Sequence, residues 1–164
     1  MAITESTLFN IDTGILQKDA FIVIVRTEWN GAIVDKLETG CIRILQQYSM
    51  KNYKVINVPG AFEIPFGIKS FWDAANLYKP QAFVALGCVL RGDTPHFDYI
   101  CKAVTEGILQ LNLSLPVPTI FGVLTVDDIE QAQERVGGEH GHKGEEAAIS
   151  ALKMILLQQS FLKA

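Results

Sequence analysis

The fold is decided by the stretch Gly87-Cys88-Val89-Leu90-Arg91-Gly92-Asp93-Thr94-Pro95-His96-Phe97-Asp98, in which an apolar run gives way to a polar loop. The run over residues 82–86 predicts a central strand, and the apolar spacing of residues 100, 104, 108 and 111 predicts a helix after the loop. A buried strand that leads through a polar loop into a helix is where an α/β protein places its chemistry.

The loop combines an anion-binding backbone with a proton carrier. Gly92 lets the main chain approach a ligand, and Thr94 with the free amides at the helix start suits an anion such as phosphate. His96 follows in the first helical turn, and its ordinary pKa of about 6.5 lets it move protons near neutral pH. The alternative is a tight turn whose histidine is a surface residue.

Four short apolar runs alternate with helical patterns along the chain. The runs cover residues 21–25, 53–58, 82–90 and 119–124. Helices are expected over residues 33–48, 64–75, 95–111, 127–135 and 144–161, with a glycine-rich break before the last. Strands that are apolar on both faces and joined through helices form a parallel sheet covered on both sides. We therefore predict an α/β fold, a flavodoxin-like three-layer sandwich around a four-stranded parallel sheet.

Ligands of such sheets bind beyond the carboxyl ends of the strands, so the residues after each strand matter. Trp29 follows the first strand, a Pro-Gly turn and Glu63 follow the second, and residues 121–125 end the fourth. Together with the loop before His96, they predict one pocket with aromatic walls, a carboxylate, an anion loop and a histidine. Glu63 either accepts hydrogen bonds from a polar heterocycle or caps a helix.

Two features lie outside this edge. Arg135 ends a short predicted helix just before two glycines. It either binds a phosphate through bidentate hydrogen bonds or is simply a basic residue that the helix dipole favours at that end. Lys143 adds positive charge nearby. Glu139, His140 and His142 could form a metal site, but a glycine-rich solvated loop holding two histidines is the favoured interpretation. We predict no metal.

Composition limits the class of protein. We expect residues 1–164 to form a single domain, and the net charge of −4 gives no basic footprint for nucleic acid. A hydrophobic content of 49% contains no run long enough to cross a membrane, so part of it is expected in subunit contacts. The first ten residues lack a secretion signal, which favours the cytoplasm, and the three cysteines are expected to be reduced packing residues.

The chain resembles the lumazine synthase family from about residue 14 to residue 161. Five ordered blocks at matching spacing carry the resemblance: residues 29–30, 59–65, 87–98, 121–125 and 131–135 with 143–144. The family condenses 5-amino-6-ribitylaminouracil with 3,4-dihydroxy-2-butanone 4-phosphate, giving 6,7-dimethyl-8-ribityllumazine, phosphate and water, and it needs no cofactor and no metal.

The resemblance also implies residue roles. Trp29 stacks on the pyrimidine, and His96 transfers protons. The remaining residues of the heterocycle and ribityl site are Asn30, Ala61, Phe62, Glu63, Cys88, Val89, Leu90 and Phe121. The phosphate site is formed by Gly92, Asp93, Thr94, Arg135 and Lys143. Trp29 stands where many members have Phe, and Glu139 and His142 replace residues that are often Lys and Asn.

Assembly follows from the same resemblance. Phe121, Arg135 and Lys143 reach the site from a neighbouring subunit, so the site exists only in an assembled pentamer. The short segment between Arg135 and Gly144 is also compatible with a sixty-subunit icosahedral shell. Residues 3–15 are expected to add an edge strand to a neighbour's sheet, and riboflavin synthase is a candidate protein partner.

Two other functions compete with this one. The related archaeal type of riboflavin synthase shares the fold and takes lumazine as its substrate. A non-catalytic ligand-binding or shell-forming protein would also keep the fold, but it has no need to combine His96 with Arg135.

Overall fold

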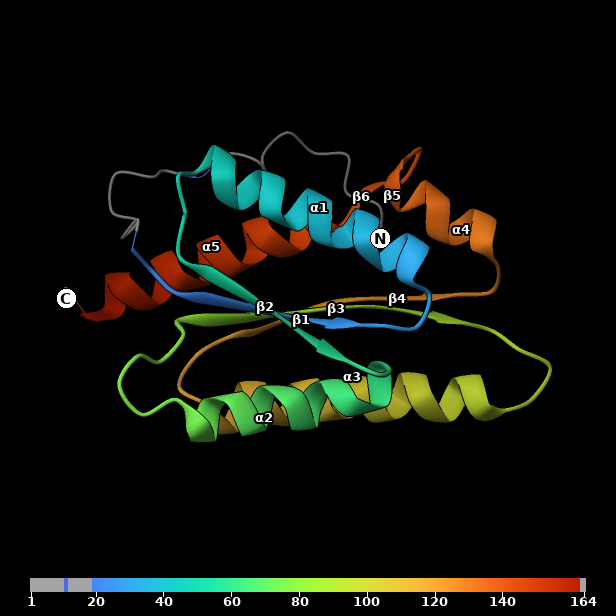
Figure 1. The fold of residues 1–164 in the computed structure, drawn as a ribbon, viewed down its shortest axis with the longest axis horizontal. Helices are drawn as coiled ribbons and strands as arrows, with labels where there is room; N and C mark the ends of the chain where they lie inside the picture. Colours follow the sequence, from blue (N-terminus) through green and yellow to red (C-terminus); the bar gives the residue numbers. More distant parts are fainter. Residues whose placement is uncertain (1–10, 12–18, 163–164) are drawn as a thin grey trace.

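The computed structural model describes residue 11 and residues 19–162. The chain forms the predicted three layers around a four-stranded parallel sheet (Figure 1). The strands are β1 (Ile22–Thr27), β2 (Tyr53–Val58), β3 (Ala82–Leu90) and β4 (Thr119–Val126), in the order β2-β1-β3-β4. The predicted edge strand over residues 3–15 lies outside the described residues, apart from Ile11.

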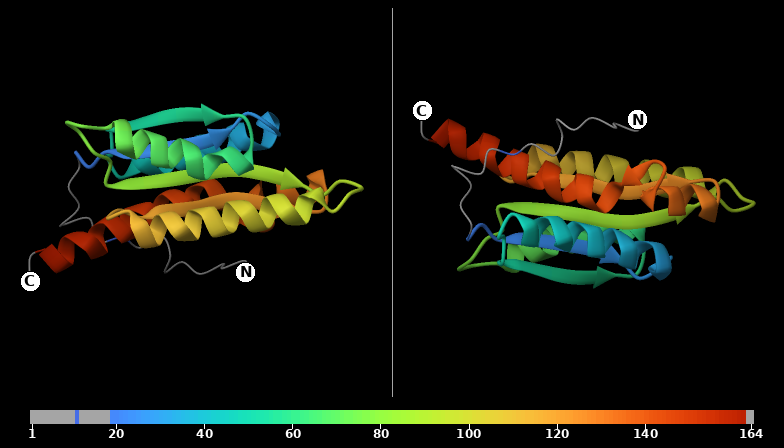
Figure 2. Two further views of the ribbon diagram at one scale, coloured as in Figure 1. Left: turned by 90° about the horizontal axis from the view of Figure 1, so that it is seen from below. Right: turned by 90° about the horizontal axis from the view of Figure 1, so that it is seen from above.

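The sheet is covered on both faces, as its two-sided apolar strands require. Helices α1 (Gly31–Gln47) and α5 (Lys143–Leu162) lie on one face, and α2 (Ile64–Ala74) and α3 (His96–Ser114) lie on the other (Figures 1 and 2). Side chains alternate along β1, so Ile22 and Ile24 pack under α1 and α5 while Val23 and Val25 pack toward α2 and α3. The core therefore consists of two apolar layers.

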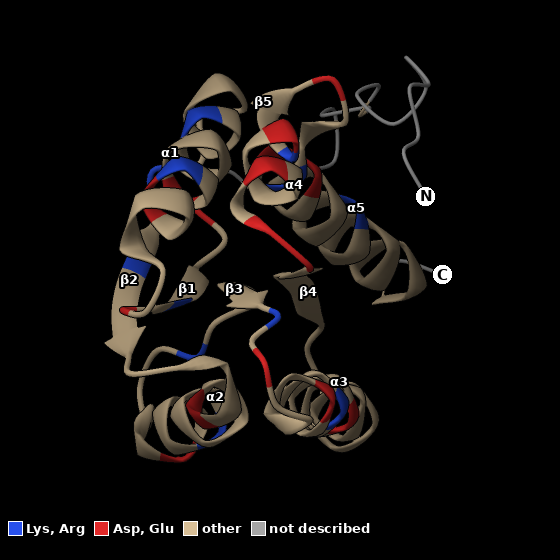
Figure 3. Ribbon diagram, turned by 90° about the vertical axis from the view of Figure 1, so that its right-hand side faces the viewer, with Lys and Arg blue, Asp and Glu red and all other residues tan. Residues whose placement is uncertain are grey.

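The carboxyl ends of the strands form one edge, seen end-on in Figure 3. The pairing of β1 with β3 stops at Arg26 and Leu86, whereas β3 continues beside β4 as far as Leu90 and Val126. Strand order reverses between β1 and β3, because the chain leaves β1 toward β2 and returns to β3 on the other side. That switch point is where open α/β sheets bind ligands.

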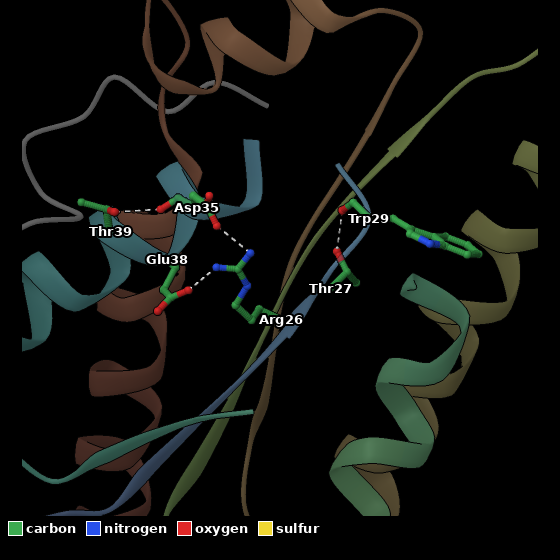
Figure 4. A network of polar contacts seen from close by, with 6 residues as sticks. All are labelled: Arg26, Thr27, Trp29, Asp35, Glu38 and Thr39. Atoms are coloured by element: carbon green, nitrogen blue, oxygen red, sulfur yellow. Dashed lines mark hydrogen bonds and ion pairs between the residues drawn. The ribbon is translucent and has the colours of Figure 1, made fainter. Parts of the chain in front are cut away.

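β1 continues through Arg26 and Thr27, two residues beyond the apolar run 21–25 that predicted it. Arg26 points toward α1, where its guanidinium lies 2.7 Å from Asp35 and 2.5 Å from Glu38 (Figure 4). The strand extends because these two carboxylates neutralise a cation that would otherwise be buried against the helix. The ion pairs also hold the start of α1 over the carboxyl end of β1.

The glycine-rich break is more regular than predicted. After α4 (Ile129–Glu134), the chain forms an antiparallel hairpin of β5 (Val136–Gly138) and β6 (Gly141–His142). The remaining short element, η2 (Ala61–Glu63), directly precedes α2. Gly137 and Gly141 have φ of 115° and 76°, which glycine adopts without strain. With these two glycines the chain forms a tight turn, in place of the expected loop, that leads directly into α5.

No helix among the described residues has the length and apolar character needed to cross a membrane.

Candidate active site

A cavity of about 440 Å³ opens at the switch point between β1 and β3, and we call it the β1/β3 cavity. Its lining includes all but one of the residues predicted for the heterocycle, and also His96. The lining residues are Thr27, Trp29, Asn30, Ala61, Phe62, Glu63, Cys88, Val89, Leu90, His96 and Ile100. Its volume is in the range of small-molecule sites. Sequence reasoning missed Thr27 and Ile100, which look like ordinary strand and helix residues.

Trp29 offers an aromatic surface at the cavity mouth. The indole contacts the main chain of Gly60, where a Cβ would lie 2.8 Å from Cε3, and the residue is still 67% exposed. Its backbone is fixed on both sides, because Thr27 Oγ1 donates to the Trp29 carbonyl at 3.2 Å and the Trp29 amide donates to Pro59 (Figure 4). A large apolar ring held in the open in this way suits stacking by a planar ligand.

The side chain of Asn30 satisfies a backbone carbonyl of β3 beyond the point where β1 and β3 stop pairing. Its φ is 58°, a left-handed conformation that asparagine tolerates, and its Nδ2 donates to the carbonyl of Cys88 at 2.7 Å. Since β1 no longer pairs with β3 at this level, the side chain takes the place of a backbone partner. The two strand ends therefore remain apart with their polar groups satisfied, which keeps the cavity open.

Glu63 performs the capping role that the sequence left open and also lines the cavity. Its Oε2 accepts a hydrogen bond from the amide of Gly60 at 3.1 Å. A carboxylate has further lone pairs, so Glu63 can accept hydrogen bonds from the N–H groups of a heterocycle at the same time.

The loop between β3 and α3 is braced by Arg91. The guanidinium Nε lies 2.6 Å from Asp127, Nη1 lies 3.3 Å from Asp98, and the cation is 4.1 Å from the centre of the Phe97 ring. Two carboxylates neutralise Arg91, so its charge supports the loop rather than an incoming anion. Gly92, Asp93 and Thr94 are exposed at the tip of this loop and line neither of the two depressions described here.

A second depression of about 360 Å³, which we call the β4 hollow, lies along the free edge of β4 beside α5. Phe121, Arg135 and Lys143 all line it. Arg135 Nη1 donates to the carbonyl of Gln131 at 2.8 Å, so the residue also caps its helix, and Lys143 Nζ lies 2.7 Å from Glu146.

The two depressions share no lining residue. The prediction of one pocket from all four strand ends is therefore wrong for a single chain, because β4 is the outermost strand, separated from β1 by β3, and Phe121 lies in its first half. Phe121 lies apart from the other predicted heterocycle residues, and Arg135 and Lys143 lie apart from the loop at residues 92–94.

The cysteines are packing residues. Burial raises the pKa of the Cys88 thiol to about 11 and that of Cys41 to about 12. Both thiols stay protonated near neutral pH and are poor nucleophiles.

The two hairpin histidines differ from each other. His140 is half-buried, but 43% of its side chain is exposed and it lies 3.3 Å from Glu134. His142 is half-buried against α1, so the prediction of a solvated loop holding both histidines is wrong for this residue. In the part of the chain that the structure describes, no group of three His, Cys, Asp or Glu side chains is placed to hold a metal ion.

Comparison with known proteins identifies the family. The family model described as 6,7-dimethyl-8-ribityllumazine synthase matches residues 19–159. A protein of that name from Parabacteroides distasonis is 48% identical over 82% of this chain and 83% of its own length. The protein of the same name from Porphyromonas gingivalis is 49% identical over 87% of this chain and 88% of its own. The chain belongs to the 6,7-dimethyl-8-ribityllumazine synthase family.

Proposed function

We propose that the β1/β3 cavity is where this chain, a transferase of riboflavin biosynthesis, joins 5-amino-6-ribitylaminouracil to 3,4-dihydroxy-2-butanone 4-phosphate. The products are 6,7-dimethyl-8-ribityllumazine, phosphate and water. The observation that carries the assignment is the joint presence of the Trp29 indole, the Glu63 carboxylate and the His96 imidazole in one cavity at the switch point. The cytoplasmic location expected from the sequence is part of this proposal.

The pyrimidine stacks on Trp29, whose ring is held by Gly60 and remains open to solvent. Glu63 accepts hydrogen bonds from the heterocycle with the lone pairs that Gly60 does not use. Ala61 and Phe62, together with Cys88, Val89 and Leu90, form the wall along the ring and the ribityl chain.

The phosphate of the second substrate binds at the exposed loop of Gly92, Asp93 and Thr94, with Arg135 and Lys143 as its cations. Thr94 supplies a hydroxyl and Gly92 an unobstructed main chain, since nothing lies within 4 Å of a Cβ there. Lys143 directs its ammonium to Glu146, but an ammonium has three donors and can contact an anion as well.

His96 moves the protons during imine formation, phosphate loss and ring closure. It is the first residue of α3, and its side chain lines the cavity. General acid–base catalysis contributes about 10² to 10⁴ in rate, whereas holding two reactants in one orientation contributes far more. Orientation is therefore the main task of the site, and His96 adds to it.

The complete site combines the β1/β3 cavity of one subunit with the β4 hollow of the next, in a pentamer that can also build a sixty-subunit shell. The separation of the two depressions on one chain supports this arrangement. Large apolar side chains on the outer faces of α2 and α3, with 71–77% exposure, provide surface for subunit contacts. They are Phe66, Tyr99 and Leu113.

Incubation of the purified protein with both substrates tests the activity. We expect lumazine fluorescence to rise only when both substrates are present. Lumazine supplied alone should give no riboflavin, and conversion to riboflavin would support the archaeal type of riboflavin synthase instead. Light scattering that shows a monomer at micromolar concentration would overturn the shared site.

Subunit mixing tests the composition of the site. Arg135→Ala damages only the β4 hollow, and His96→Ala damages only the β1/β3 cavity. When the two variants are co-assembled in equal amounts, about a quarter of the sites receive two intact halves, so activity should exceed that of either variant alone. Activity equal to the mean of the two variants would show that one chain forms the whole site.

A further inference from the structure

The hairpin of β5 and β6 determines where the two proposed phosphate cations lie. Arg135 immediately precedes β5 and Lys143 immediately follows β6. The amide of Lys143 donates to the carbonyl of Arg135 at 2.8 Å, and Val136 pairs with His142. We call Arg135 and Lys143 the phosphate clamp. Any shift of the hairpin moves both of its members.

His142 seats this hairpin on α1. Its imidazole fills the space that a side chain on Gly40 would occupy, since a Cβ there would lie 2.5 Å from Nδ1 and 2.6 Å from Nε2. Nδ1 is buried and has no hydrogen-bond partner. The absence of a side chain on Gly40 is therefore what allows the ring to pack against the helix backbone.

The surroundings of the ring disfavour a positive charge. Burial lowers the pKa of His142 and Arg43 of α1 lowers it further, while a hydrogen bond to the backbone of His142 itself and the charge of Glu146 of α5 act in the opposite direction. Arg43 pairs with Glu145, and Glu146 is engaged by Lys143, so neither carboxylate is free to neutralise an imidazolium. The other histidine of the hairpin, His140, is directed to Glu134.

We propose that His142 is a positioning residue for the phosphate clamp: its uncharged imidazole holds the hairpin on Gly40 and thereby fixes the placement of Arg135 and Lys143. The inference rests on the proposed function of these two cations. Protonation would place a charge on a ring that is partly removed from water and would add a cation beside Arg43.

The sign of the pH dependence follows. The imidazole of His142 has a lower pKa when it is packed on Gly40 than when it is free. This packing is therefore strongest above the free histidine pKa of about 6.5 and weakens as the pH falls through and below that value. The clamp loses its geometry on the acid side.

Sulfate is a suitable probe, because its charge stays constant over the relevant pH range while that of phosphate does not. Calorimetry would measure the dissociation constant for sulfate between pH 7.5 and pH 5.5 in the assembled protein. We expect wild type to weaken by about fivefold or more over this range, the lower end of ordinary coupling between sites. His142→Asn removes the imidazole and does not titrate, so it should bind sulfate more weakly than wild type at pH 7.5 and show no further weakening at pH 5.5.

His140→Asn is the matched control, since it removes the other histidine of the same hairpin, which is directed to Glu134 and not to Gly40, and it should keep the wild-type profile. Gly40→Ala tests the seat independently, because its methyl group displaces the imidazole. It should bind sulfate more weakly already at pH 7.5.

The outcomes distinguish a failure of the proposed phosphate clamp from a failure of the positioning role of His142. If wild type does not bind sulfate at pH 7.5, or if Arg135→Ala binds it equally well, the proposed phosphate clamp is wrong. If binding depends on Arg135 but wild type and His142→Asn share one pH profile, or if Gly40→Ala binds like wild type, the positioning role of His142 is wrong.

Discussion

Gly144→Ala tests how closely α5 must approach α1 for the clamp to form. A Cβ on Gly144 would meet the carbonyl oxygen of Leu37 first, and it would lie 2.8 Å from the carbonyl carbon and 2.9 Å from the Cα of that residue, where ordinary contact begins at 3.4 Å. All three are backbone atoms, so no rotamer change relieves the overlap, and α5 must move outward by more than the roughly 0.6 Å that the carbonyl carbon alone requires. Overpacking of this kind costs about 1–3 kcal/mol.

The chain offers a control at a comparable position. Gly31 and Gly144 are the first and second residues of α1 and α5, neither has a positive φ, and a Cβ on Gly31 meets nothing within 4 Å. Each alanine gains up to about 1 kcal/mol in helix propensity, so Gly31→Ala should stabilise the protein. The two variants should differ in free energy of unfolding by the overpacking cost, about 1–3 kcal/mol.

Guanidinium denaturation followed by circular dichroism, at one fixed protein concentration, measures the difference. Gly144→Ala should also raise the KM for the butanone phosphate, because the displaced helix begins at Lys143 of the clamp. Equal stability of the two variants would refute the close packing of α5 on Leu37. Lower stability with an unchanged KM would separate this packing from the position of the clamp.

Three further predictions concern the site. Trp29→Ala should weaken pyrimidine binding by about 1 kcal/mol or more in calorimetry, with Trp29→Phe retaining most of the affinity, and equal affinity in all three proteins would limit the indole to packing. His96→Ala should lower kcat and flatten the pH–rate profile, whereas Arg135→Ala should raise the KM for the butanone phosphate by a factor that corresponds to about 1.5–3 kcal/mol per lost bond, and an unchanged pH profile in His96→Ala would remove its catalytic role. Since burial raises the pKa of Cys88 from 9.0 to about 11, iodoacetamide should alkylate it at pH 8 about a hundredfold more slowly than a free cysteine, which peptide mass spectrometry would detect.

The sheet could be predicted from the sequence because its strands are apolar on both faces. Residues 82–86 face α1 and α5 at one position and α2 and α3 at the next, so burial on both sides leaves a continuous apolar signal. Arg26 is not part of this apolar signal, because its inclusion in β1 depends on its ion pairs with Asp35 and Glu38 of the following helix, α1. The hairpin after Arg135 has no periodicity, and its two left-handed glycines are compatible with a loop as well as with a turn.

The β1/β3 cavity was predictable for a different reason. The ends of parallel strands meet at one edge, so Trp29, Glu63 and His96 come together as soon as the strands are correctly placed. The β4 hollow was not predictable by this argument, because proximity at an edge also depends on the order of the strands. With β4 outermost, Phe121 and Arg135 line the β4 hollow instead of the cavity at the switch point.

Because Arg135 and Lys143 line the β4 hollow and not the cavity at the switch point, the positions of these two cations depend on tertiary contacts. A residue on the loop after a central strand is positioned by the sheet itself, and His96 needs only β3 and the start of α3. Arg135 and Lys143 leave the sheet edge on a short hairpin, whose placement relies on two contacts with α1, those of His142 with Gly40 and of Gly144 with Leu37. Substitutions at Gly40 of α1, which contacts the hairpin and does not line the β1/β3 cavity, should therefore affect phosphate binding before they affect the pyrimidine.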